Sequence, residues 1–381
     1  MTPLHGLKVL ELARVLAGPW AGQIFADLGA DVIKVESPEG DETRFWGPPF
    51  APDGAAAYYH CANRGKRDVT ANFRNPDDLA MVKALAAEAD VIIENFKLGG
   101  LAKFGLDYVS LAPSNPGLVY CSITGFGQTG PYAPRAGYDF IIQAMGGIMD
   151  LTGEPDGEPQ KPGMAYADLF TGLYGVIGIQ AALAQRAVTG KGQHIDMALF
   201  DTQLAVLANQ STNYLTSGIS PRRMGNAHPN IVPYQVFYAS DAPFVIACGN
   251  DHQFKHLCVK LGLTLHLDDR FAKNTNRVTH REALVPLLAA EMVRHSRAEM
   301  LALMEAAGVP AGPINTVAEA LADPQTQARN MVQDHGQTRS VRLPIVFSDA
   351  DMPTPSAAPL MGADSDEIRA AAAQHRWPTK D

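Results

Sequence analysis

The chain has 381 residues, of which 46% are hydrophobic and 19% charged, and its formal net charge at pH 7 is −9. A chain of this length can bury a sizeable core and commonly forms two domains. The acidic balance argues against a nucleic-acid-binding protein, which usually carries a basic surface. No run approaches 18 uninterrupted apolar residues and the N-terminus does not have the pattern of a signal peptide, so we expect neither a membrane span nor secretion.

The first 130 residues alternate short β-rich runs with helical stretches. Strands are predicted at residues 7–12, 31–36, 89–95 and 118–124, with a helix over 77–89. A long apolar helix follows at 166–187, and then a strand at 194–199. This alternation predicts an α/β protein whose large, Rossmann-like domain has a parallel sheet covered by helices. Residues 217–235 are rich in Gly, Pro, Asn and Arg and read as a linker, and a second β/α pattern starts at 244–249.

A glycine-rich loop follows the strand that ends at residue 124. Gly125, Gly127 and Gly130 match the GxGxxG pattern of dinucleotide-binding proteins. That pattern requires a helix directly after the glycines to bind the pyrophosphate, and Pro131 and Pro134 prevent one here. We therefore expect a loop close to a ligand and no dinucleotide site.

Cysteine and histidine spacing gives no sign of a metal site or of a disulfide framework. His252 and His256 are four residues apart on a predicted helix, but no third ligand is evident. The cysteines are scattered and form no CxxC pair: Cys61, Cys121, Cys248 and Cys258. Free thiols are typical of a reducing compartment, so we expect a cytoplasmic protein without a bound metal.

Basic residues recur in the N-terminal half, and several of them follow predicted strands, where open α/β sheets bind ligands. Ordinary solvation at the surface explains any one of them, but together they could neutralise a ligand that carries several phosphates. They are Arg14, Arg64, Lys66, Arg67, Arg74, Lys97 and Lys103.

Asp168 lies at the start of the long apolar helix, upstream of Gly172, Gly175 and Gly178. One interpretation is a helix cap, since Asp is a favoured residue at helix N-termini. The other is a carboxylate nucleophile, kept ionised by the helix dipole and shielded from water by apolar neighbours. The composition of the segment does not decide between the two.

Several collinear segments resemble the family III CoA-transferases, also called the CaiB/BaiF family. They include residues 6–12 with 17–19, 28–38, 63–67, 94–96, 125–131, 138–139, 162–172 and 190–193. The resemblance implies a large domain at 1–199, completed by 346–381, and a small α/β domain at 223–324, with linkers at 200–222 and 325–345. It also implies an interlocked homodimer.

By this resemblance, Asp168 is a nucleophile that forms a covalent aspartyl-CoA thioester. The CoA thioester is then a substrate rather than a tightly bound cofactor, and a small carboxylic acid is its partner. Residues matching the family's CoA contacts are Val15, Ala17, Ala71, Arg74, Asn95, Phe96 and Lys103. Tyr138 and Asp139 would shape the acyl pocket, and the N–H of Gly249 could bind an oxyanion.

Two other functions stay open. The superfamily includes 2-methylacyl-CoA racemases, but Tyr138 stands where those enzymes have a histidine base, and a phenol is a poor replacement. A non-catalytic CoA-binding protein, with Asp168 as a cap, is the other alternative. Within the transferases, residues 225–229 and 233–234 resemble the subgroup that acts on dicarboxylic acids such as glutarate, with succinyl-CoA as donor.

Overall fold

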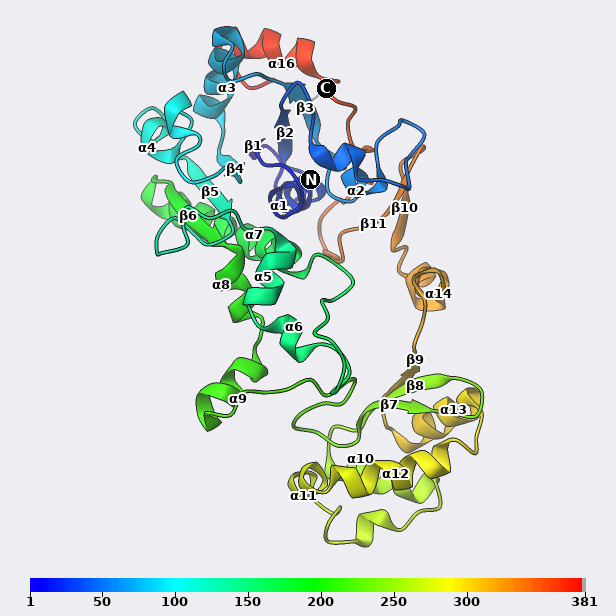
Figure 1. Cartoon of the computed structure of the whole chain (residues 1–381). Helices are drawn as coiled ribbons and strands as arrows, with labels where there is room; N and C mark the ends of the chain where they lie inside the picture. The colour runs from blue at the N-terminus through cyan, green and yellow to red at the C-terminus, as the bar shows by residue number, and fades with distance from the viewer. Residues whose placement is uncertain (379–381) are drawn as a thin grey trace. The chain divides into compact units, whose positions relative to one another are not determined.

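The computed structural model describes residues 1–378, and the chain divides into two compact units. The first unit comprises residues 1–148, 161–218 and 326 onward, and the second comprises 149–160 and 219–325. The chain therefore leaves the first unit and returns to it, as its colour gradient shows (Figure 1).

A six-stranded parallel sheet forms the centre of the first unit, in the order β3-β2-β1-β4-β5-β6. Its strands are β1 (Lys8–Glu11), β2 (Asp31–Glu36), β3 (Arg67–Thr70), β4 (Val91–Glu94), β5 (Val119–Thr124) and β6 (Gln193–Ala198). The predicted α/β class with a parallel sheet is confirmed. The strand order reverses between β1 and β4, and open α/β sheets bind ligands at the carboxyl ends of the strands at such a point.

Helices cover both faces of this sheet (Figure 1). Alternate strand residues face opposite sides: Val9 and Val91 pack with α1 (Ala17–Asp27) and α7 (Tyr166–Thr189). Leu10 and Ile92 pack with α3 (Pro76–Glu88) and α16 (Ser365–Ala372). Burial on both faces explains why these strands are nearly continuous apolar runs in the sequence.

The long helix α7 packs closely on α1 because of its glycines. A Cβ at Gly172 would lie 2.7 Å from the carbonyl oxygen of Ala17, a distance that no side chain tolerates. By length and composition α7 is also able to cross a membrane, with 39% of its most apolar window buried. The count of uninterrupted apolar residues missed this property, because glycines and polar residues such as Asp168, Thr171 and Gln180 interrupt the run.

The second unit has a three-stranded antiparallel sheet of β7 (Tyr234–Tyr238), β8 (Pro243–Ala247) and β9 (Ala311–Pro313). Its core gathers apolar side chains such as Phe254, Leu284 and Met300 from α10 (Asp251–Lys260), α12 (Arg281–Met292) and α13 (Arg297–Ala307). Shorter elements used below belong to the first unit: α2 (Ala57–His60), α5 (Asp139–Met145) and α8 (Leu199–Ala205).

Candidate active site

Two adjoining pockets lie where the strand order of the large sheet reverses. The Asp168 pocket, about 140 Å³, is lined by the loops that follow β1, β4 and β5 and by Asp168 itself. The Arg74 pocket, about 500 Å³, is lined by residues that follow β1, β2 and β3, and by Lys103. Arg14 and Phe96 line both pockets, so the two pockets are immediate neighbours.

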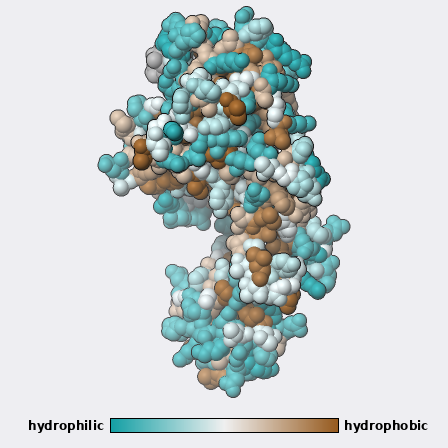
Figure 2. Space-filling view, turned by 90° about the vertical axis from the view of Figure 1, so that its left-hand side faces the viewer, coloured by the Kyte–Doolittle hydropathy of each residue, from teal (hydrophilic) through white to brown (hydrophobic). Residues whose placement is uncertain are grey.

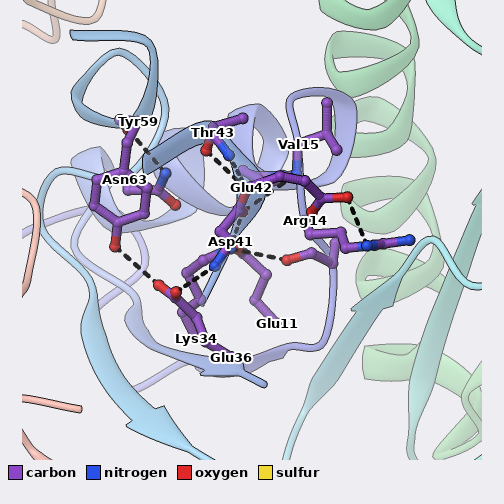
Figure 3. Close-up of polar contacts among 12 residues, drawn as sticks. Glu11, Arg14, Val15, Lys34, Glu36, Asp41, Glu42, Thr43, Tyr59 and Asn63 are labelled. Carbon is purple, nitrogen blue, oxygen red and sulfur yellow. Dashed lines mark hydrogen bonds and ion pairs between the residues drawn. The ribbon is translucent and has the colours of Figure 1, made fainter. Parts of the chain in front are cut away.

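The loop after β1 contributes to the walls of both pockets, and polar contacts fix its backbone. The Asn95 side chain donates to the Arg14 carbonyl oxygen (2.6 Å) and accepts from the Arg14 N–H (3.0 Å). Val15 has a positive φ of 70°, a conformation that costs energy for a β-branched residue. Its N–H donates to both carboxylate oxygens of Asp41, at 3.2 and 3.3 Å, as Figure 3 shows.

Asp41 belongs to a buried network of charges beneath this loop (Figure 3). The Lys34 ammonium donates to Asp41 (3.0 Å), to Glu11 (3.2 Å) and to the carbonyl oxygen of Ala13 (2.9 Å). Burial alone would lower the pKa of Lys34, but the Glu11 and Asp41 carboxylates raise it above its ordinary value. Lys34 therefore keeps its charge, and its contacts hold the pocket loop against the sheet.

Three of the basic residues suggested as ligand contacts are part of the structure instead. Lys66 is fully buried in an ion pair with Glu11 (2.8 Å). Arg64 pairs with Asp27 (2.6 Å), and Arg67 pairs with Asp31 (2.6 Å). A buried cation requires a carboxylate partner, and these three have theirs within the protein, so the suggestion is wrong for them.

The Arg74 pocket gathers four of the predicted CoA contacts: Ala71, Arg74, Phe96 and Lys103. Aromatic rings form part of its wall, with Phe73 stacked on Phe96 at 6.1 Å between centroids. Within the described residues, neither Arg74 nor Lys103 forms an ion pair. Unpaired cations beside stacked rings suit a ligand that combines phosphates with a planar base.

The Asp168 pocket gathers the other members of that prediction, Val15, Ala17 and Asn95, together with Tyr138 and Asp168. Asp168 is in the first turn of α7 and is 9% exposed. No described residue donates a hydrogen bond or an ion pair to its carboxylate. The cap interpretation is therefore wrong for Asp168, whose carboxylate does not bind the free N–H groups of the helix.

Asp139 supplies the cap in its place. Its Oδ1 accepts from the N–H of Ala167 (2.9 Å) and from that of Asp168 (3.3 Å). Asp139 is not among the residues that line the Asp168 pocket, unlike its neighbour Tyr138. Burial, and then the negative charge of Asp139, raise the pKa of Asp168 to about 7. A buried carboxylate with a raised pKa and no partner is typical of a reactive group.

Gly249 belongs to the second unit, where it follows β8. Its N–H donates to the side-chain oxygen of Gln253 at 2.8 Å. The backbone donor that was expected to bind an oxyanion is therefore occupied within its own loop, and its role stays a prediction.

Sequence reasoning missed Lys34, Asp41 and Gln143. The sequence did contain a signal for Lys34, which stands in the middle of the predicted strand 31–36. If that strand is buried on both faces, a charged side chain within it must have a partner. Asp41 carries no comparable local signal, because only the fold brings it to the N–H of Val15. Gln143 donates to Asp139, four residues earlier on α5, and this i, i+4 spacing was a local signal that went unused.

The parallel sheet, the pockets at its reversal point and the unpaired carboxylate define an α/β protein in which a buried acidic side chain lies next to a pocket that carries unpaired cations. The chain belongs to CoA-transferase family III, whose sequence profile matches residues 4–365. It is 53% identical to the succinate–glutarate CoA-transferase of Agrobacterium fabrum, over 97% of this chain and 95% of that one. It is 43% identical to the acetyl-CoA:oxalate CoA-transferase of Acetobacter aceti, over 92% of this chain and 90% of that one.

Among solved structures, a CaiB/BaiF family protein from Brucella suis superimposes with a TM-score of 0.88 at 62% identity, covering 97% of this chain and 99% of that one. The chain is accordingly an acyl-CoA:carboxylate CoA-transferase, and the predicted family is confirmed. The relatives' names favour transfer of CoA over the racemase and binding-protein alternatives.

Proposed function

We propose that this chain transfers CoA from an acyl-CoA such as succinyl-CoA to a dicarboxylic acid, through a covalent intermediate on Asp168. The observation that carries the proposal is the unpaired carboxylate of Asp168, whose pocket shares Arg14 and Phe96 with the neighbouring pocket of Arg74 and Lys103. The nucleotide end of CoA fits the Arg74 pocket, and its thioester then reaches the Asp168 pocket.

The proposed reaction conserves the thioester bond energy. A carboxylate oxygen of Asp168 attacks the donor's acyl carbon, the C–S bond breaks, and the CoA thiolate leaves an aspartyl–acyl anhydride. The thiolate attacks the Asp168 carbonyl carbon, the aspartyl C–O bond breaks, and the donor acid departs as a carboxylate. The acceptor carboxylate then attacks the aspartyl-CoA thioester, and the same steps in reverse give the new acyl-CoA and free Asp168.

A dicarboxylic acceptor is supported by the charges around the pocket and by the names of the relatives. Arg14 and Arg135 line the same pocket as Asp168. Arg135 forms no ion pair with a described residue, and its guanidinium lies 4.6 Å from the ring centre of Tyr132. A guanidinium of this kind can bind the second carboxylate of an acceptor whose first carboxylate reacts at Asp168.

The proposal includes a homodimer, supported by apolar side chains at the surface. On α7, Leu173 and Tyr174 are each 42% exposed and Ile177 is 61% exposed. Figure 2 shows brown, apolar side chains exposed among hydrophilic ones on the face that it views. Exposed apolar patches of this kind commonly mark protein interfaces.

Peptide mapping after hydroxylamine trapping tests the proposed intermediate. Wild-type protein incubated with succinyl-CoA should give a hydroxamate on the peptide that contains Asp168, and Asp168→Asn should give none. Asp201→Asn, which neutralises an exposed carboxylate on α8, is the matched control and should behave as wild type. Turnover by the wild type without any modified Asp168 would contradict the proposal.

A further inference from the structure

The capping carboxylate of Asp139 is held in one position by three N–H donors. Two of them are the backbone N–H groups of Ala167 and Asp168 at the start of α7. The third is the side chain of Gln143, one turn further along α5, which donates to Oδ2 at 2.7 Å. Gln143 is completely buried, so this side chain fixes Asp139 from within the protein.

Asp168 lies beside this fixed negative charge and has no compensating partner. Its own N–H donates to Asp139, while its carboxylate is open to the pocket. Two like charges close together in a buried site raise the free energy of the ionised state. The contact between the two residues therefore positions Asp168 and at the same time raises the free energy of its ionised form.

Other titratable groups around Asp168 do not relieve this repulsion. The phenol of Tyr58 on α2 faces both aspartates, and burial together with their charges raises its pKa to about 12, so it stays neutral. Arg14 and Arg135 line the pocket but do not lower the pKa of Asp168. The elements packed against α7 carry further titratable groups that take no part in the shift: Asp27, Tyr120, Cys121, His194, Asp196 and Asp201.

We propose that Asp139, fixed by Gln143, is a positioning residue that favours the covalently modified state of Asp168 over its free carboxylate. This inference rests on the proposed function. In the anhydride the negative charge has moved to the thiolate sulfur, and in the aspartyl-CoA thioester it has left with the donor carboxylate. Asp168 is neutral in both states, so the repulsion from Asp139 acts on the free enzyme and is relieved each time Asp168 is acylated.

The variant Asp139→Asn removes the charge and retains the cap. Asparagine is as good a capping residue as aspartate. The Oε1 of Gln143 is buried without a hydrogen-bond partner, so if the Gln143 amide group rotates by a half turn, its Oε1 can accept from the N–H of the new asparagine side chain. We expect the acid limb of the kcat/KM profile to move to lower pH by about one unit. At pH 8.5 with succinyl-CoA, a smaller fraction of Asp168 should be trapped. A difference of one pKa unit corresponds to a fall of about tenfold in the equilibrium constant for modification of Asp168.

Gln143→Met provides a second test, because it removes the donor that fixes Asp139 and leaves the carboxylate of Asp139 in place. The fraction of Asp168 that is trapped at pH 8.5 should lie between the fractions of wild type and Asp139→Asn. Asp201→Asn is the control for loss of a charge on a neighbouring helix and should leave both readouts at the wild-type values.

The outcomes separate this inference from the function on which it rests. The role of Asp139 would be overturned if wild type and Asp139→Asn had the same acid limb in the kcat/KM profile and the same trapped fraction of Asp168. That result would leave the aspartyl intermediate intact. A wild-type protein that turns over without any adduct on Asp168 would overturn both. A loss of activity in Asp139→Asn with an unmoved acid limb would show a merely structural cap and also overturns the inference.

Discussion

The first unit contains two groups of buried charges, which differ in whether the charges have partners of opposite sign. Glu11 is fully buried and contacts two ammonium groups, those of Lys34 and Lys66. Asp168 is 9% exposed, contacts no cation among residues 1–378 and lies next to a second carboxylate. The paired charges hold the loop that forms the pocket, whereas the unpaired charge is available for chemistry. Burial alone therefore does not identify a reactive carboxylate; burial without a partner does.

Removing the unpaired carboxylate should have the largest effect on activity. Asp168→Asn keeps the size of the side chain but cannot form the anhydride, so kcat should fall by roughly 10⁴-fold. CoA should still bind, because the Arg74 pocket is unchanged, and this can be measured by calorimetry. Activity within tenfold of wild type would mean that Asp168 is not the nucleophile.

Breaking the paired network should reduce stability instead. Lys34→Met leaves Glu11 and Asp41 buried with fewer partners, and we expect a loss of about 3–5 kcal/mol in the free energy of unfolding. The matched control is Lys8→Met, which breaks a partly exposed ion pair with Glu88 and should cost about 0–1 kcal/mol. Urea unfolding of the two variants measures the difference. Equal losses would contradict the view that the buried network holds the loop.

The same substitution that abolishes activity should increase stability at high pH. The pKa of Asp168 is raised to about 7 in the folded protein from the ordinary carboxyl value of 3.8, so the folded state binds its proton more tightly than the unfolded state does. Asp168 therefore lowers the free energy of unfolding progressively as pH rises from about 4 to 7. Asp168→Asn should be more stable than wild type by roughly 1–4 kcal/mol at pH 8.5, with no difference below pH 4.

The free energy of unfolding of both proteins, measured at pH 8.5 and below pH 4, tests the sign of this difference. A variant that is less stable than wild type at pH 8.5 would show that the carboxylate has a stabilising partner, and the contrast with Glu11 would disappear.

The smallest effect is expected at the far end of the site. Arg74→Ala or Lys103→Ala removes one unpaired cation, and KM for the acyl-CoA should rise roughly tenfold with kcat nearly unchanged, since a hydrogen bond to a charged group contributes about 1.5–3 kcal/mol. The wild-type KM should rise with salt more steeply than that of either variant. Arg270→Ala, at an exposed pair with Asp268 in the second unit, is the control. A change in kcat without a change in KM would mean that these residues act in the chemical steps and not in binding the acyl-CoA.

The sequence allowed most of the sheet to be predicted because both faces of its central strands are buried, which leaves a mostly apolar run for β1, β2, β4 and β5. It did not predict β3, whose four residues Arg67–Thr70 include two charged ones. It also singled out Asp168, but the resemblance to the family was needed to prefer a nucleophile over a cap. The local sequence could not do so: the N-cap position is Ala165, and the capping carboxylate comes from Asp139, 29 residues before Asp168.

Partners of buried charges were the main feature that the sequence concealed. Lys66 looked like a surface or ligand-binding residue, because its partner Glu11 is 55 residues away along the chain. Arg64 and Arg67 were misassigned for the same reason, with partners 37 and 36 residues away. Arg74 and Lys103, which read the same in the sequence, line the pocket. Only the fold distinguishes a cation that has an internal partner from one that is free to bind a ligand.

The mass of the intact protein during a single turnover tests the central claim most directly. Wild-type protein mixed with succinyl-CoA in the absence of an acceptor should gain the mass of CoA less one water, and the gain should disappear when glutarate is added. Asp168→Asn should show no gain under the same conditions. A wild-type protein that transfers CoA to glutarate while its mass never changes would contradict the account.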